Sequence, residues 1–172
     1  MRRLIRDLDD NLERYLMLVA YTFCCFVILH EVIRRFMLNY SAAWAQETAQ
    51  FAFIYLGWIG AAFAVKERAH VKFDIILHKL APSGRRVLLI LGEILTIVFA
   101  LIALNFTKHV IEQHLQFANS TDVLRVSRVW AEAAVPIGFT LIVFRSLQRI
   151  WRDLADLRAG RPPFEGTAMF ED

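Results

Sequence analysis

The segment from Thr48 to Val65 most constrains how this chain can fold, because its 18 residues carry no formal charge. At a helical rise of about 1.5 Å per residue, such a helix nearly crosses a hydrocarbon layer roughly 30 Å thick. Polar side chains mark both of its ends: Gln46, Glu47 and Gln50 at one, and Lys66, Glu67, Arg68 and His70 at the other. The pattern predicts a transmembrane helix.

Small residues recur within this segment at spacings of three and four, namely Gly57, Gly60, Ala61 and Ala64. This spacing places them on one helix face, where a second backbone can approach closely in lipid. Trp58 lies in the middle of the span, where packing is a more natural role than anchoring at the membrane surface. We expect these five residues to pack against another helix of this chain or against a partner subunit.

The composition extends this prediction to the whole chain. Hydrophobic residues make up 57% of the sequence, above the roughly 45–50% that is usual in soluble domains. We predict an all-α integral membrane protein with four transmembrane helices in one domain, residues 1–158, and a flexible tail, residues 159–172. The predicted spans cover about 15–33, 48–65, 87–107 and 129–148.

Two amphipathic segments flank the predicted spans, at about 2–14 and 71–80. Apolar residues at helical spacing among charges are typical of a helix that lies on the membrane surface. Segment 2–14 fits equally well as the start of the first span. Segment 71–80 is followed by Pro82, Ser83 and Gly84, which would end such a helix.

The distribution of lysine and arginine predicts the orientation. With both termini on one side, that side holds 15 of the 20 basic residues. Because basic residues concentrate on the cytoplasmic side, we expect both termini and the loop from Lys66 to Arg86 to be cytoplasmic. The basic excess then reflects topology, and it gives no reason to expect nucleic-acid binding.

One acidic residue, Glu93, falls roughly 10 Å into the predicted third span at helical rise. A carboxylate at that depth requires a partner, a proton or water. Two interpretations stay open: an ion or proton site, or a structural ion pair with a basic residue such as Arg145. We favour the structural pair.

The remaining polar residues form no recognisable catalytic or cofactor site. The histidines are not arranged to face one another at depth, as haem ligands in a helical bundle would be. Cys24 and Cys25 are adjacent in an apolar run, and the sequence has no nucleophile triad, phosphate-binding loop or zinc motif. Pro136 lies within the predicted fourth span and favours a bend there. We therefore predict no enzymatic activity, no metal and no cofactor.

Two blocks of residues resemble the small membrane subunit of the tripartite ATP-independent periplasmic (TRAP) transporters, the DctQ-like family. The first block runs from Trp44 and Glu47 through the small residues of the central span to His70 and Asp74. The second block comprises Trp130, Pro136, Gly138 and Arg145. The resemblance covers about residues 10–152, and the four-span layout with cytoplasmic termini agrees with it.

The resemblance implies a function without catalysis in the bacterial inner membrane. A small subunit of this family pairs with a large multi-span subunit that carries the substrate and sodium sites. A periplasmic binding protein delivers the solute, usually an organic acid. This chain would then be a scaffold in contact with membrane lipids, the large subunit and, at its outer side, the binding protein.

Two other classes of function are weighed against this one. The chain could be a self-sufficient small transporter that uses Glu93 as its coupling carboxylate. It could also anchor a redox enzyme in the membrane, although the arrangement of its histidines argues against haem. Transport by the chain alone would favour the first of these, and a haem absorption spectrum the second.

Overall fold

The computed structural model describes residues 2–68, 82–117 and 119–161, and these residues are helical apart from short connections. The helices are α1 (Arg2–Met37), α2 (Ala43–Lys66), α4 (Pro82–Gln116), α5 (Val129–Glu132) and α6 (Ala134–Arg158). The predicted surface segment 71–80 and most of the predicted tail lie outside the described residues.

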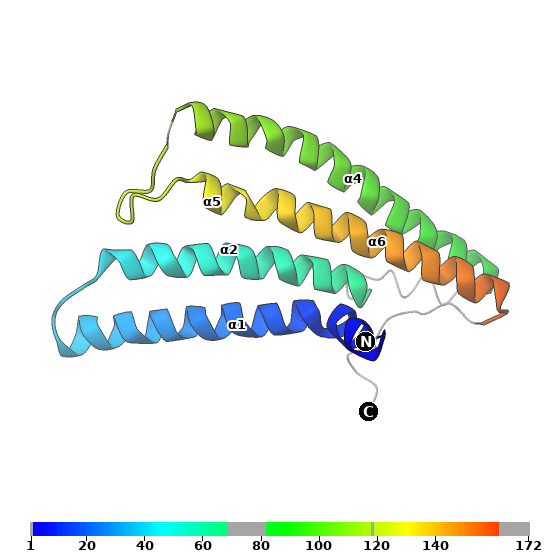
Figure 1. Cartoon of the computed structure of the whole chain (residues 1–172), viewed down its shortest axis with the longest axis horizontal. Coiled ribbons are helices and arrows are strands. Elements are labelled where there is room, and N and C mark those ends of the chain that lie inside the picture. The colour runs from blue at the N-terminus through cyan, green and yellow to red at the C-terminus, as the bar shows by residue number, and fades with distance from the viewer. Residues whose placement is uncertain (1, 69–81, 118, 162–172) are drawn as a thin grey trace.

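The helices form a single row instead of a compact bundle. In Figure 1, α1 lies beside α2, α2 beside α6, and α6 beside α4, so that α1 and α4 occupy opposite edges. Successive long helices run in opposite directions. One end of the row, here called the terminal end, holds the chain's start, the end of α2, the start of α4 and the end of α6. The opposite end is called the hairpin end.

Four helical segments are long and apolar enough to cross a membrane, which confirms the predicted number of spans. They cover Asn11–Met37, Ala43–Lys66, Gly84–Gln116 and Val129–Arg158. Helix α1 continues without interruption through both segment 2–14 and the predicted span 15–33. The position of segment 2–14 on a membrane surface stays a prediction.

The last span is divided into α5 and α6 at Ala133, which keeps right-handed helical dihedrals of φ −61° and ψ −23°. Pro136 lies in the first turn of α6 and has no N–H to donate to the Glu132 carbonyl, so the helical hydrogen bonding is interrupted at this point. The Tyr55 hydroxyl of α2 donates a hydrogen bond to the Trp130 carbonyl at 2.7 Å, which ties α5 to α2.

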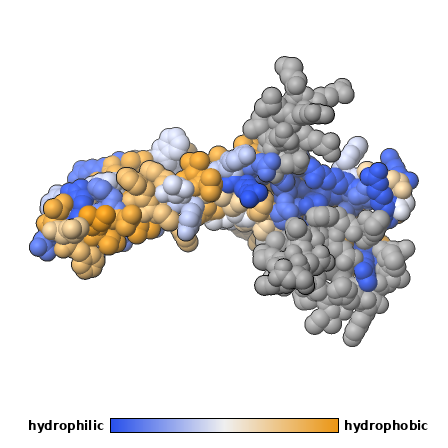
Figure 2. Space-filling model, turned by 90° about the horizontal axis from the view of Figure 1, so that it is seen from below, coloured by the Kyte–Doolittle hydropathy of each residue, from blue (hydrophilic) through white to orange (hydrophobic). Residues whose placement is uncertain are grey.

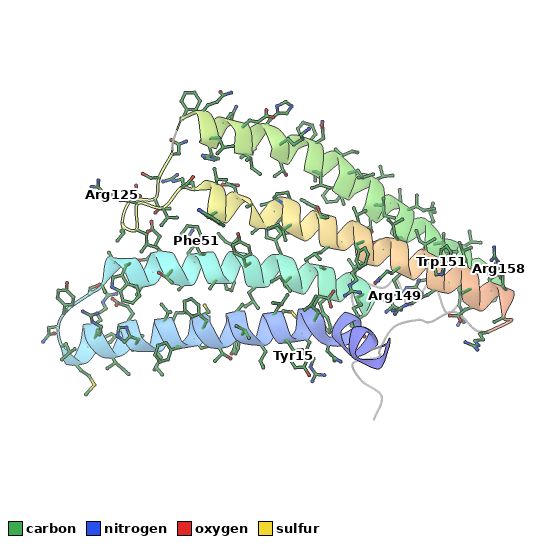
Figure 3. The ribbon with its side chains drawn as sticks, viewed as in Figure 1. Tyr15, Phe51, Arg125, Arg149, Trp151 and Arg158 are labelled. Atoms are coloured by element: carbon green, nitrogen blue, oxygen red, sulfur yellow. The ribbon has the colours of Figure 1, made fainter. Side chains whose placement is uncertain are left out.

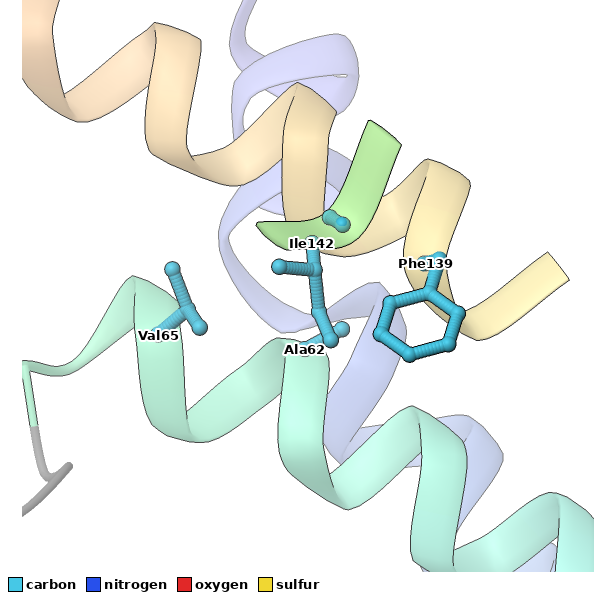
Figure 4. Packing of buried hydrophobic residues seen from close by; sticks show 5 residues of the cluster. Ala62, Val65, Phe139 and Ile142 are labelled. Atoms are coloured by element: carbon cyan, nitrogen blue, oxygen red, sulfur yellow. The ribbon is translucent and has the colours of Figure 1, made fainter. Parts of the chain in front are cut away.

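The apolar core lies where the two central helices meet α4. Ala62 and Val65 of α2 pack with Phe139 and Ile142 of α6 and with Ala100 of α4 (Figure 4). Small side chains dominate the α2 and α4 sides of this core, which allows the helices to come close in a lipid environment.

Most large apolar side chains point away from the protein. Val19 of α1 is 67% exposed and Phe99 of α4 is 65% exposed. Figure 2, seen from the α1 edge, shows an apolar band along the molecule and hydrophilic residues at the terminal end. A row of helices with apolar outer surfaces is stable when lipid or another membrane protein covers them, because lipid tails solvate apolar side chains well.

Candidate functional site

A cluster of buried polar residues joins four helices near the terminal end, and we call it the charge cluster. Each member has at most 9% of its surface exposed. Its members are Glu13 of α1, Lys66 and Arg68 at the end of α2, Glu93 of α4, and Arg145, Ser146, Arg149 and Asp153 of α6.

Glu13 is the centre of the first half of the cluster. Its carboxylate lies 3.3 Å from the Lys66 Nζ and also accepts charge-assisted hydrogen bonds from the Arg145 guanidinium. Only 2% of Glu13 is exposed. The Arg145 guanidinium also donates a hydrogen bond to the Gln148 side chain at 2.6 Å. One carboxylate of α1 therefore connects α2 and α6.

Arg68 is the centre of the second half. Its guanidinium contacts Asp153 of α6, and its Nε lies 3.7 Å from a Glu93 carboxylate oxygen of α4. Arg68 ends α2 with a left-handed backbone, φ 51°, while its N–H donates to the Val65 carbonyl at 3.1 Å. That conformation costs a non-glycine residue about 1–2 kcal/mol. The contacts with two carboxylates offset this strain and hold the turn in place.

Helix α6 carries the cluster because Arg145, Arg149 and Asp153 recur every four residues and so lie on one face. Arg149 lies between α6 and the end of α2 (Figure 3). It is within electrostatic reach of Glu93, and the fully buried Ser146 hydroxyl lies beside that carboxylate. All four helices of the row therefore meet at this face.

The charges of the cluster nearly balance, with four basic and three acidic side chains. Charges within a span are costly unless they meet one another, so this arrangement favours one register of the four helices over any that separates the pairs. The cluster is suited to hold helices together. It is poorly suited to bind a cation at Glu93, because Arg68 and Arg149 lie near that carboxylate and would repel the ion.

The hairpin end contains a second set of polar contacts. The Glu31 carboxylate accepts hydrogen bonds from the Ala42 N–H and the Ser41 hydroxyl, each at 3.0 Å, and so satisfies backbone at the start of α2. The Glu47 carboxylate accepts a hydrogen bond of 2.6 Å from the Leu124 N–H. This bond fixes the loop between α4 and α5 to α2.

The structure places the predicted packing residues as follows. Trp58 lies against Phe139, with ring centroids 4.7 Å apart, and against Gly138, where a Cβ would come within 2.5 Å of its ring. A Cβ on Gly60 would lie 3.6 Å from the Met17 Sδ, whereas one on Gly57 would meet nothing within 4 Å. Ala61 packs against the apolar core and Ala64 is half-buried.

The other family-motif positions divide between the two ends of the row. The Trp44 ring lies 6.0 Å from the His30 ring, Trp130 is exposed, and Glu47 holds the loop. Glu93 contacts Arg68, while the candidate partner named from sequence, Arg145, contacts Glu13. His70 and Asp74 lie outside the described residues. Their roles, like those of all these residues in subunit contact, stay predictions.

Sequence reasoning missed Glu13, Arg149 and Asp153. The repeat of Arg145, Arg149 and Asp153 was a usable signal, since three ionisable residues on one face of a helix that continues a span need a common partner. Glu13 gave a weaker signal, because it lies in a segment whose charges all resemble those of a surface helix.

Comparison with known proteins identifies a family for this chain. Residues 24–156 match the family described as "Tripartite ATP-independent periplasmic transporters, DctQ component". The sialic acid TRAP transporter small permease protein SiaQ of Vibrio cholerae is 27% identical over 153 residues, covering 87% of this chain and 85% of that protein.

Two further relatives extend the comparison. The C4-dicarboxylate TRAP transporter small permease protein DctQ of Rhodobacter capsulatus is 31% identical over 61% of this chain and 46% of that protein. The isethionate TRAP transporter permease protein DctMQ of Oleidesulfovibrio alaskensis is 23% identical, covering 82% of this chain but only 23% of that protein. With four spans, a matching family over most of its length and small permease proteins among its relatives, the chain belongs to the DctQ component family of TRAP transporters.

Proposed function

We propose that this chain is the small permease subunit of a tripartite transporter and that it serves as a static scaffold for the large membrane subunit. The observation that carries the proposal is the charge cluster, which connects all four helices with buried ion pairs and so favours a single arrangement of the row. A scaffold needs such a fixed arrangement, whereas a subunit that moves substrate needs two.

The lengths of the relatives support a large partner subunit. The segment similar to this chain covers 23% of DctMQ, which is itself called a permease protein, so in that relative it is joined to a much longer remainder. The row of helices here has broad apolar surfaces on which a second membrane protein could pack.

The alternative of a self-sufficient transporter that uses Glu93 is less well supported. Arg68 lies 3.7 Å from the Glu93 carboxylate, and Arg149 is within electrostatic reach. A coupling cation would have to displace or overcome these positive charges. We therefore expect the coupling cation to bind on the partner chain.

The transported solute is proposed to be a small organic anion. The relatives are named for sialic acid, C4-dicarboxylates and isethionate, which are all organic anions. We propose that uptake by the complete system is driven by sodium and depends on a soluble binding protein. This chain would hold neither the solute nor the ion.

Reconstitution in liposomes tests the scaffold function. The large subunit with this chain and the binding protein should take up solute, and this chain alone should not. Replacing Glu93 by glutamine should lower the yield or the thermal stability of the complex but leave the cation dependence of uptake unchanged. Uptake by this chain alone, or an altered cation dependence in a well-folded Glu93→Gln complex, would support the alternative instead.

We further propose that the terminal end lies in the cytoplasm, which the distribution of basic residues supports. In a variant without Cys24 and Cys25, single cysteines at Asn39 and Ser120 should react with an impermeant thiol reagent added outside. A cysteine at Ser83 should not react. Labelling at Ser83 in intact cells would reverse the proposed orientation.

A further inference from the structure

The terminal ends of α4 and α6 extend past the end of α2 (Figure 1). They are joined there, because the Arg86 guanidinium near the start of α4 donates a hydrogen bond of 2.6 Å to the Arg161 carbonyl just after α6. We call residues 82–91 and 150–161 the projecting pair. Its two helix ends lie side by side and carry their arginines close together.

The exposed face of α6 changes in character toward the terminal end. Phe144, Leu147, Trp151, Leu154 and Arg158 recur every three or four residues, so they share one face of the helix. The first four are between 44% and 77% exposed, with Trp151 the most exposed of them, and Arg158 is exposed as well. Figure 3 shows Trp151 and Arg158 on the projecting pair. The face is therefore apolar along most of its length and ends in an arginine.

Helix α2 gives a scale for the depth of these side chains. Its uncharged segment ends at Val65, and Arg68 contacts Asp153 of α6, so Asp153 lies near the edge of the hydrocarbon layer. At helical rise, Trp151 lies about 3 Å to the hydrocarbon side of Asp153 and Arg158 about 7.5 Å beyond it. The headgroup layer on each side of a bilayer is roughly 5–7.5 Å thick. Trp151 thus falls at the edge of the hydrocarbon, and Arg158 falls among the phosphates.

The projecting pair is strongly basic. Its two acidic residues are already paired with arginines, Asp153 with Arg68 and Asp156 with Arg161 at 3.8 Å. Guanidinium groups suit phosphate, because their planar set of N–H donors matches its oxygens. The pair carries five arginines against these two aspartates: Arg85, Arg86, Arg152, Arg158 and Arg161.

We propose that the projecting pair binds the headgroup of an anionic phospholipid, with Arg86 and Arg158 at the phosphate and Trp151 at the top of the acyl chains. The charge of the pair favours an anionic lipid over a zwitterionic one. The order of side chains along α6 favours lipid over a protein partner, because it follows the depth profile of a bilayer from hydrocarbon to phosphate. Tryptophan is the residue type that prefers the boundary between them.

Lipid photo-labelling tests this site in the assembled complex. The chain and the large subunit are placed in nanodiscs of equal parts phosphatidylglycerol and phosphatidylcholine. One of the two lipids carries a diazirine at the acyl carbon nearest the headgroup, and labelled peptides are identified by mass spectrometry. We expect phosphatidylglycerol to label residues 147–158 several times more than phosphatidylcholine does. The exposed surface around Val19 of α1 should be labelled equally by both.

A pair of arginine variants tests the role of charge. Arg158 and Arg35 are both exposed and both lie in the last turn of a helix, but at opposite ends of the row. Arg158→Gln should lower the preference for phosphatidylglycerol at residues 147–158 by about fivefold, which is the contribution of one basic residue near an anionic membrane. Arg35→Gln should leave that preference unchanged.

Three results would overturn the lipid site. Equal labelling of residues 147–158 by the two lipids in the unmodified complex would show no selectivity for anionic headgroups. No lipid label there at all would show that the large subunit covers this face. An equal change in Arg158→Gln and Arg35→Gln would show a general effect of charge. The lipid site does not depend on the proposed scaffold function, which uptake by the chain alone would refute separately.

Discussion

Replacing Glu13 by alanine should be among the most damaging single substitutions in this chain. The Glu13 carboxylate is 2% exposed and meets two cations, Lys66 and Arg145, whose side chains are 6% and 3% exposed. Alanine removes the negative charge from between them but leaves both cations buried. It also removes the two ion pairs that join α1 to Lys66 and Arg145.

The expected loss follows from the burial of this site. Removing one partner from a buried ion pair typically costs about 3–5 kcal/mol, because the remaining charge keeps its desolvation cost without its compensation. The unfolding equilibrium should then shift by a factor of about 10² to 4 × 10³, since each 1.4 kcal/mol is about tenfold. Glu13→Gln should lose less, because the amide oxygen still accepts a hydrogen bond from Arg145.

The assay is a reversible unfolding titration of the purified chain in mixed micelles, followed by loss of helical signal. Glu112→Ala is the matched control, because the Glu112 side chain is 59% exposed and forms an ion pair with the exposed His109 at 3.6 Å. A surface pair of this kind contributes about 0–1 kcal/mol. If Glu13→Ala loses no more stability than Glu112→Ala, the charge cluster does not hold the helices together.

Two other substitutions test contacts between neighbouring helices. Gly138→Ala should destabilise the chain by about 1–3 kcal/mol, because the added Cβ would meet the Trp58 ring at 2.5 Å, whereas Gly57→Ala should be nearly neutral. Thermal unfolding of the two variants side by side measures the difference. Equal melting temperatures would show that the close contact between Trp58 and Gly138 does not limit which residue can stand at position 138. Glu31→Ala should cost about 1 kcal/mol by removing acceptors from the Ala42 N–H at the start of α2, and hydrogen exchange at that amide should rise.

The number of spans could be predicted from sequence because lipid sets a simple requirement. A helix that crosses the hydrocarbon layer needs nearly twenty apolar residues, whatever it packs against. The run from Thr48 to Val65 meets that requirement, and so do three other segments of the chain. The order of helices in the row is a different matter, since it depends on pairings between residues far apart in sequence.

The charge cluster could not be predicted in full because α6 reverses the pattern of a water-soluble helix. Its apolar residues Leu147 and Trp151 are 54% and 77% exposed, while Arg145 and Arg149 are buried. In water the same sequence would bury the apolar face and expose the arginines. Only the position of α6 between two other helices decides which face turns inward.

Glu93 shows where sequence reasoning was sufficient and where it was not. Its depth in a span predicted a structural partner, and the structure provides one in Arg68. The identity of the partner depended on how α2 ends, because Arg68 reaches Glu93 from a left-handed turn that the residue type does not favour. Pro136 predicted a bend in the last span, and the division between α5 and α6 falls at Ala133, where this proline has no N–H for the Glu132 carbonyl.

We expect the row of helices to keep one arrangement while the complete transporter works. Spin labels on cysteines at Val19 of α1 and Phe99 of α4, in a chain without Cys24 and Cys25, report the distance between the two edges of the row. Both positions are exposed, at 67% and 65%, so that labels fit without disturbing the core. A row that keeps one arrangement gives the same distance distribution in the resting complex and in the complex with binding protein, ions and solute. A second distance that appears only during uptake would contradict it.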